Sequence, residues 1–281
     1  MSENNSKAEI SEKVWRAYMT GGAMPDFVHS PWYESKLFRP IIKRLPTDPR
    51  CRICYIPFEG IGGTLGRIFW GVERSKMNPH LCNICERAAE RFPGGAEVEA
   101  SLLFVDVRGS IGLAENMSPA EFSQLMSRFY NATTKVLFRN NAMVEKFVGD
   151  EVAAFFVPGF AGEEHARAAV GAGEEILRAI GYHDPKGPWI PIGIGIHTGL
   201  VYVGAVGAES GVPDISVLGD TANATARITS MAGEGEILIS EEAMRAAGLD
   251  VEGLESRHLE LRGRKEAMDV WVKRIGTDYK V

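Results

Sequence analysis

Along residues 100–275, short apolar runs alternate with amphipathic stretches. The run 101–107 (SLLFVDV) is typical of a buried strand. Residues 118–121 (SPAE) combine an N-cap serine, a proline and an acid, and they predict the start of a helix that ends near Arg139. Residues 142–157 (AMVEKFVGDEVAAFFV) predict two short strands joined by a tight Gly-Asp turn.

The alternation of strands and helices continues toward the carboxyl end. Residues 162–181, rich in Ala and Glu, predict a second helix, and residues 189–207 predict two strands around a glycine turn. A third helix is expected from Asp220, followed by short strand, helix and strand elements. The sequence therefore predicts an α+β fold class, an α/β sandwich with a ferredoxin-like βαββαβ core over residues 100–275 and appended strands and helices.

The first hundred residues do not follow this pattern. Residues 1–50 begin with a polar stretch that we expect to be frayed, and the prolines from residue 25 onward exclude long helices, so we predict a helical and irregular extension. Residues 51–95 contain the cysteines and predict a small cysteine module. The glycine-rich run at 60–66 (GIGGTLG) is expected to form the turn at which the loop between the cysteines folds back. Residues 93–99 (PGGAEVE) have the composition of a linker.

The composition limits the classes of protein that fit. The chain has 281 residues, enough for one large domain or for a domain with a smaller module. A hydrophobic content of 45% with 24% charged residues excludes wholesale disorder. No apolar stretch approaches the roughly 18 residues that a membrane span needs, and the amino end lacks a secretory signal. A net charge of −6 argues against nucleic acid as a partner. From these features taken together we expect a cytoplasmic protein.

Two aspartates lie at neighbouring turns of the predicted sandwich. Asp106 ends the first strand and is followed by a loop through Gly109 and Ser110, and Asp150 lies in the turn between the second and third strands. The first and third strands of this fold are antiparallel neighbours, so we expect the carboxylates to converge. Paired oxygen ligands suit Mg²⁺ or Mn²⁺, and the loop amides can receive phosphate oxygens. The alternative is a helix cap beside an ordinary Gly-Asp turn.

The cysteines form two Cys-x-x-Cys pairs, Cys51/Cys54 and Cys82/Cys85. Two such pairs fit a tetrahedral four-cysteine zinc site, in which each tight knuckle supplies two thiolates. An iron–sulfur cluster, a redox switch and buried thiols are the alternatives, and disulfides are least expected in a reducing cytosol. His80 is a further ligand candidate, although four cysteines already complete a site.

Four separated blocks give the clearest functional signal: LLFVDVRGS, EKFVGDEVAAFF, IGIGIHTGLVYVGAVG and LGDTANATARI. In this order and spacing they resemble the catalytic domain of class III nucleotidyl cyclases, over residues 100–275. The resemblance implies an enzyme that binds two Mg²⁺ or Mn²⁺ ions per site through Asp106 and Asp150, with the Val107 carbonyl as a further ligand. A likeness of residues 148–152 (VGDEV) to the Gly-Gly-Asp-Glu-Phe turn of diguanylate cyclases is weaker, because valine replaces the first glycine.

The resemblance also implies roles for residues beyond the two aspartates. Asn223 and Arg227 match the family's transition-state pair, which orients the ribose and neutralises charge on the α-phosphate. Arg262 falls where the family usually has a lysine that contacts the terminal phosphates. In this family the metal ligands of one chain face the transition-state pair of another, which implies a head-to-tail homodimer with two equivalent sites. We expect His197 to be structural, because the mechanism needs no histidine.

Two positions are expected to read the base. Lys146 matches the lysine of adenylate-type members, where an ammonium donates to adenine N1; this favours ATP, with 3′,5′-cyclic AMP and pyrophosphate as products. The second is Ser216, whose hydroxyl donates or accepts, so GTP, UTP and CTP stay alternatives, and Asp214 is a second candidate for this role. A catalytically silent nucleotide-binding or zinc scaffold protein is the alternative outside the enzymes.

Overall fold

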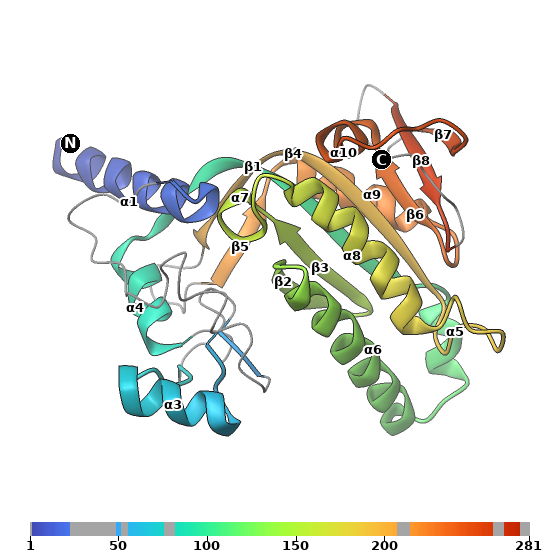
Figure 1. Cartoon of the computed structure of the whole chain (residues 1–281), viewed down its shortest axis with the longest axis horizontal. Coiled ribbons are helices and arrows are strands. Elements are labelled where there is room, and N and C mark those ends of the chain that lie inside the picture. Colours follow the sequence, from blue (N-terminus) through green and yellow to red (C-terminus); the bar gives the residue numbers. More distant parts are fainter. Residues whose placement is uncertain are drawn as a thin grey trace. The chain divides into compact units, whose positions relative to one another are not determined.

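The computed structural model describes residues 2–22, 49–51, 56–75, 82–206, 214–260 and 267–275 (Figure 1). The chain divides into two compact units. The first unit comprises Met1–Tyr18, Gly22–Ala96 and Val203–Ser216, and the second comprises Met19–Gly21, Glu97–Tyr202 and Val217–Val281. The predicted division into segments 1–50, 51–95 and 100–275 stays a prediction.

The described strands are β1 (Gly94–Val107), β2 (Met143–Val148), β3 (Glu151–Phe156), β4 (Ile192–Val206), β5 (Asp214–Leu218), β6 (Ile237–Ser240), β7 (Glu255–Leu259) and β8 (Met268–Lys273). They form a mixed sheet in the order β2-β3-β1-β4-β6-β8-β7, with β5 paired to β4. β3 is antiparallel to both β1 and β2, whereas β4 and β6 are parallel. The order of the first four positions is that of the predicted ferredoxin-like core, which is therefore confirmed.

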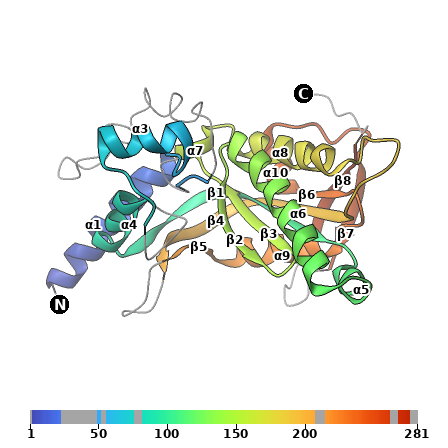
Figure 2. The same ribbon diagram turned by 90° about the horizontal axis from the view of Figure 1, so that it is seen from below.

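The described helices are α1 (Ser2–Thr20), α3 (Gly60–Trp70), α4 (Asn83–Arg91), α5 (Ser110–Glu115), α6 (Pro119–Arg139), α7 (Pro158–Ala161), α8 (His165–Ile180), α9 (Asp220–Met231) and α10 (Glu241–Ala247). In the second unit, α6, α8 and α10 cover one face of the sheet and α9 covers the other (Figure 2). The strand β6 shows the alternation behind this arrangement. Ile237 and Ile239 belong to the core beneath α8 and α10, whereas Leu238 packs with α9.

The two long helices of the second unit begin or end at the signals that the sequence contains. The Ser118 hydroxyl accepts a hydrogen bond from the Glu121 amide, and the Glu121 carboxylate accepts one from the Ser118 amide, so α6 opens with a capping box. α8 ends at Gly181, whose φ of 104° lies in the left-handed region that favours glycine. The predictions of a helix to Arg139 and of a second helix before Gly181 are confirmed.

The prediction of two strands around a glycine turn at 189–207 is wrong, because β4 runs without interruption from Ile192 to Val206. Its alternate glycines allow α9 to approach the strand closely. A Cβ on Gly195 would lie 2.3 Å from Oγ1 and 2.6 Å from the amide nitrogen of Thr229, and one on Gly199 would lie 2.8 Å from Oγ1 of Thr221. The glycines that suggested a turn are therefore packing positions between strand and helix.

Three expectations for the first hundred residues are also corrected. The polar start is not frayed but helical in α1, and the Trp15 indole of this helix donates a 2.8 Å hydrogen bond to the Phe92 carbonyl. Residues 93–99 are not a linker, since β1 begins at Gly94. The run 60–66 is part of helix α3, not a turn. Residues 23–48, with most of the prolines, lie outside the described residues.

We predict that Gly195→Ala destabilises the protein, because the added methyl group would meet the backbone of Thr229 in α9. The expected loss in the free energy of unfolding is about 1–3 kcal/mol. The matched control is Gly171→Ala in the interior of α8, where an added Cβ meets no atom within 4 Å. This control should gain about 0.5–1 kcal/mol from helix propensity. Denaturant unfolding of the two variants measures both, and equal stabilities would contradict the packing argument.

Candidate active site

The two aspartates meet at one edge of the sheet, as the sequence predicts. Asp106 is the penultimate residue of β1, and Asp150 lies in the turn between β2 and β3. In the register of β1 and β3, Asp106 is opposite Glu151, and the Val107 amide donates a 3.3 Å hydrogen bond to the Asp150 carbonyl. Three carboxylates therefore lie at the same end of two paired strands.

The electrostatics of this edge favour a bound cation. Burial raises the pKa of Asp106 above its ordinary value of 3.8; the Arg108 charge opposes this rise and the Asp150 charge adds to it. Burial, followed by the charge of Asp106, raises the pKa of Glu151 from 4.5 to about 7. Both shifts mean that negative charge is costly here. A divalent cation offsets that cost, and the predicted ligands Asp106, Val107 and Asp150 offer the oxygen atoms that Mg²⁺ and Mn²⁺ prefer.

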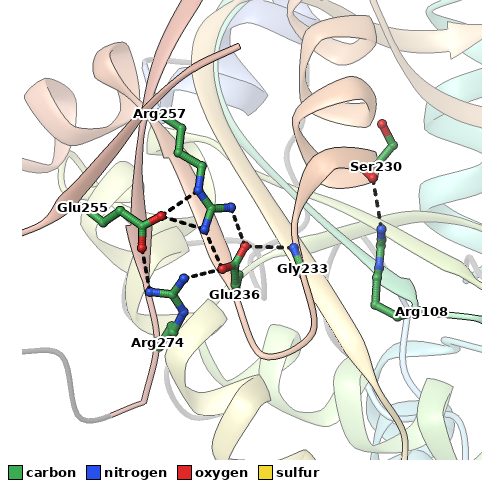
Figure 3. Close-up of polar contacts among 7 residues, drawn as sticks. All are labelled: Arg108, Ser230, Gly233, Glu236, Glu255, Arg257 and Arg274. Atoms are coloured by element: carbon green, nitrogen blue, oxygen red, sulfur yellow. Dashed lines mark hydrogen bonds and ion pairs between the residues drawn. The ribbon is translucent and has the colours of Figure 1, made fainter.

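Arg108 connects this edge of the sheet to helix α9. Its guanidinium forms an ion pair with the Asp106 carboxylate, and its Nη1 donates a 3.2 Å hydrogen bond to the Ser230 carbonyl near the end of α9 (Figure 3). Its amide donates a 2.9 Å hydrogen bond to the Pro191 carbonyl. The role of Arg108 could not be predicted from the sequence, because only the fold brings Ser230 beside it.

A loop and a cavity adjoin Asp150. Gly109, with φ of 66°, precedes the first residue of α5, Ser110, so the predicted phosphate-binding positions lie where β1 leads into a helix. The Tyr130 hydroxyl donates a hydrogen bond to the Gly149 carbonyl and thereby holds the β2–β3 turn. A cavity of about 450 Å³ opens beside these residues, and its lining includes Ser110, Ile111, Met126, Tyr130, Gly149 and Asp150.

A β-bulge sets the position of the predicted base-reading residue Lys146. The register of β2 on β3 shifts between Val144 and Lys146, so Glu145 is the extra residue. The Glu145 carboxylate is buried, lies 3.2 Å from Nζ of Lys146 and accepts a 3.1 Å hydrogen bond from the Val217 amide in β5. Glu145 therefore joins the strand of Lys146 to the strand that carries Ser216. This buried link could not be predicted from the sequence, since the bulge exists only in the paired sheet.

Asn223 and Arg227 lie one turn apart on α9, as predicted, and both side chains reach solvent. Within the part of the chain that the structure describes, neither side chain forms a hydrogen bond or an ion pair. The arginine that contacts Asp106 is Arg108, not Arg227. The predicted transition-state pair is thus available on the surface of α9.

An ion network around the buried Glu236 carboxylate fixes the loop that follows α9 (Figure 3). Both oxygens of Glu236 accept 2.7 Å hydrogen bonds from Arg257, and one of them also accepts a 2.9 Å bond from the Gly233 amide. Arg274 binds both Glu236 and Glu255. The hydrogen bonds from Arg257 are the main cause that lowers the pKa of Glu236 to about 2. Together with Arg108, this network holds the carboxyl end of α9 from two sides.

The remaining predicted residues divide into two groups. His197 is buried, and its Nδ1 lies 2.8 Å from the Ser240 hydroxyl, which agrees with a structural role. Cys51, Cys82 and Cys85 lie together in the first unit. Three predicted residues lie outside the described part of the chain: Cys54, His80 and Arg262. The side chain of Asp214 also lies outside it.

Residues 96–274 match the family model of the adenylate and guanylate cyclase catalytic domain. The chain therefore belongs to the class III nucleotidyl cyclases. Domains of this family bind nucleoside triphosphates, use divalent metal ions and act as dimers. No helix in the described part of the chain combines the length and the hydropathy that a membrane span requires.

The relatives include cyclases of both base specificities. An adenylate cyclase of Anabaena cylindrica is 26% identical over 71% of this chain and 42% of its own length, and one of Mycobacterium bovis is 27% identical over 62% and 39%. The guanylyl cyclase Cya2 superposes with a TM-score of 0.58 at 27% identity, covering 64% of this chain and 93% of that one. The adenylyl cyclase CyaB from P. aeruginosa gives 0.56 at 25%, covering 65% and 96%. The chain spans about two fifths of the length of these curated relatives.

We predict that the metal-free protein loses stability as the pH rises from about 4.5 to about 7, because Glu151 has a raised pKa in the fold. A raised carboxyl pKa means that the folded chain binds the proton more tightly, so ionisation favours unfolding. Glu151→Gln should therefore have a higher Tm than the parent protein at pH 8, and the difference should disappear near pH 5. Thermal unfolding with a chelator present measures it.

Glu115→Gln on the exposed surface of α5 is the control for the loss of a carboxylate. A Tm difference between Glu151→Gln and the parent that is the same at pH 5 and pH 8 would contradict the prediction.

Proposed function

We propose that the protein converts ATP to 3′,5′-cyclic AMP and pyrophosphate, at two equivalent sites of a head-to-tail homodimer. The observation that carries this proposal is the meeting of Asp106 and Asp150 at the end of β1 and β3, with Lys146 on the adjoining strand β2. ATP as the substrate is consistent with a cytoplasmic reaction. The Anabaena adenylate cyclase supports the proposal, since its similarity extends over most of this chain.

Each predicted residue has a defined task in this reaction. Asp106, Asp150 and the Val107 carbonyl would hold two Mg²⁺ or Mn²⁺ ions, which lower the pKa of the ribose 3′-hydroxyl and stabilise the leaving pyrophosphate when bound. Arg227 supplies fixed positive charge where the α-phosphate gains negative charge, and Asn223 orients the ribose. The amides of the loop at Gly109 and Ser110 receive phosphate oxygens, and Arg262 contacts the terminal phosphates.

The choice of base depends on Lys146 and Ser216. The half-exposed Lys146 can donate to adenine N1, which has no proton, whereas N1 of guanine carries one and would need an acceptor. The Ser216 hydroxyl is compatible with the adenine amino group but also with a carbonyl oxygen of another base. GTP is the second candidate, and the likeness to the guanylyl cyclase Cya2 is the observation that favours it.

We predict that, with Mn²⁺ present, the protein forms cyclic AMP from ATP faster than it forms a cyclic product from GTP, UTP or CTP. Lys146→Glu replaces a donor to the base by an acceptor, so it should lower the ratio of ATP to GTP turnover by at least about 10-fold. The control Lys186→Glu has the same charge change in an exposed loop and should keep the ratio. Product analysis by chromatography measures all four reactions.

Two results would contradict this assignment of the substrate. Formation of product only from GTP, UTP or CTP would overturn ATP, and the absence of product from all four nucleotides would favour a catalytically silent protein.

The homodimer predicts complementation between two inactive variants. Asp106→Asn lacks a metal ligand and Arg227→Ala lacks the transition-state charge, so each alone should lose roughly 10²-fold or more in turnover. In an equal mixture with free exchange of chains, half of the dimers are mixed, and each mixed dimer has one intact site. The mixture should therefore recover about a quarter of the parent activity.

The matched control is a mixture of Asp106→Asn with Asp150→Asn. Both changes damage the same half of each site, so no mixed dimer has an intact site and no activity should return. Equal recovery in the two mixtures, or none in the first despite chain exchange, would contradict sites shared between two chains.

A further inference from the structure

Three cysteines of the first unit, distant in sequence, lie together in its interior. The sulfur atoms of Cys51, Cys82 and Cys85 are all within 4.8 Å of one another, and their residues are 0%, 0% and 2% exposed. No disulfide joins any two of these three cysteines. A tetrahedral zinc ion with Zn–S bonds of about 2.3 Å separates its sulfur ligands by about 3.8 Å, so this triangle needs little adjustment to hold one.

We propose that Cys51, Cys82 and Cys85 bind a structural zinc ion, with Cys54 as the fourth ligand. Cys54 lies outside the described residues and is nominated by the Cys-x-x-Cys spacing alone. Four thiolates close the coordination sphere, which is the arrangement of structural rather than catalytic zinc. The ion is separate from the divalent cations of the active site, because its ligands are soft sulfur atoms instead of carboxylates.

Backbone hydrogen bonds fix the chain on both sides of the first cysteine pair. The Cys51 amide donates a 3.0 Å hydrogen bond to the Ile56 carbonyl, and the Phe58 amide donates a 2.8 Å bond to the Pro49 carbonyl. The chain on either side of the Cys-x-x-Cys pair thus meets in an antiparallel β-bridge between Arg50 and Pro57, which fixes Cys51 beside it.

The second pair begins in the same way. Cys82 forms a β-bridge with Arg74, and the next residue, Asn83, donates a 2.9 Å backbone hydrogen bond to the Glu73 carbonyl. Helix α4 starts at Asn83, so Cys82 precedes the helix and Cys85 lies in its first turn. Each cysteine pair therefore begins at or beside a β-bridge, although the two pairs are far apart in sequence.

Backbone amides donate hydrogen bonds to two of the three sulfur atoms. The Cys82 amide lies 3.3 Å from the sulfur of Cys51, and the Cys85 amide lies 3.3 Å from the sulfur of Cys82. The amino end of α4 adds the positive end of a helix dipole. Zinc binds thiolates, so donors to sulfur are expected around a metal site, whereas apolar packing of neutral thiols needs none.

The apolar core of this region is small, so a bound metal ion can add to its stability. Among residues 49–92 that the structure describes, the buried hydrophobic residues are Cys51, Ile56, Phe58, Val72, Cys82, Cys85 and Phe92, and three of these seven are cysteines. Helix α3 contacts this region mainly through its backbone. Gly63 lies so close to Phe58 that a Cβ at this position would be 2.5 Å from the Phe58 carbonyl group. A bound metal ion would add to the stability of this small set of described core residues.

The close spacing of the sulfur atoms also favours one ion over a cluster of several. An iron–sulfur cluster distributes its thiolates over separate iron atoms and needs them farther apart, whereas one tetrahedral ion holds all of them on a single centre. Zinc and a single iron share this geometry, so the test must distinguish them.

The test is the metal content of the purified full-length protein, measured by plasma mass spectrometry after dialysis. We expect about one zinc per chain. Cys82→Ser and Cys85→Ser should each lose most of it, whereas Thr64→Ala, an exposed change on α3 in the same region, should keep it. One equivalent of iron, or no bound metal, would overturn the proposal.

A second measurement on the unaltered chain covers the case in which a cysteine variant fails to fold. Replacement of the bound ion by Co²⁺ should give thiolate-to-cobalt charge-transfer absorption and the intense visible bands of a tetrahedral centre. Titration with a mercurial reagent should release one zinc for the four thiols. Four thiols that react at once in the native protein, without release of zinc, would contradict the site. Both readouts are independent of cyclase activity.

Discussion

The antiparallel register of β1 and β3 is the constraint on which the catalytic edge depends. Leu103, Val105 and Val107 of β1 belong to the main core, together with Val152 and Ala154 of β3. Asp106 alternates with these residues and therefore points to the other face of the sheet. A slip of one residue would move the aspartate into the core and three apolar side chains out of it. The hydrophobic core thus also decides where the carboxylates meet.

This arrangement destabilises the ionised carboxylates of Asp106 and Glu151. Asp106 and Glu151 both have raised pKa values, which means that the fold holds negative charge in a place where water solvates it poorly. Arg108 offsets part of this cost through its ion pair with Asp106. A site whose own charges are incompletely neutralised favours the binding of a divalent cation with a polyanionic nucleotide. The same feature destabilises the metal-free protein at neutral pH.

The sequence predicted best those features whose signals are local. The capping box of α6 and the Gly-Asp turn between β2 and β3 each depend on a few adjacent residues. The glycines of β4 were misread as a turn because their role depends on α9, which follows much later in the chain. The meeting of Asp106 and Asp150 could also be predicted, because each lies at a strand end and the strand order brings those ends together. The contacts of Glu145 and Arg108 could not, since a bulge and a helix end brought together by the fold give them their partners.

Arg108 has a particular position in the proposed dimer. It contacts Asp106, which serves one site, and the end of α9, which carries Asn223 and Arg227 for the other site. A cation that binds Asp106 competes with Arg108 for the same carboxylate, because both require its oxygen atoms. Release of the guanidinium from Asp106 would remove the link between this carboxylate and the carboxyl end of α9. Arg108 is thus a short physical connection between Asp106 and the end of the helix that carries Asn223 and Arg227.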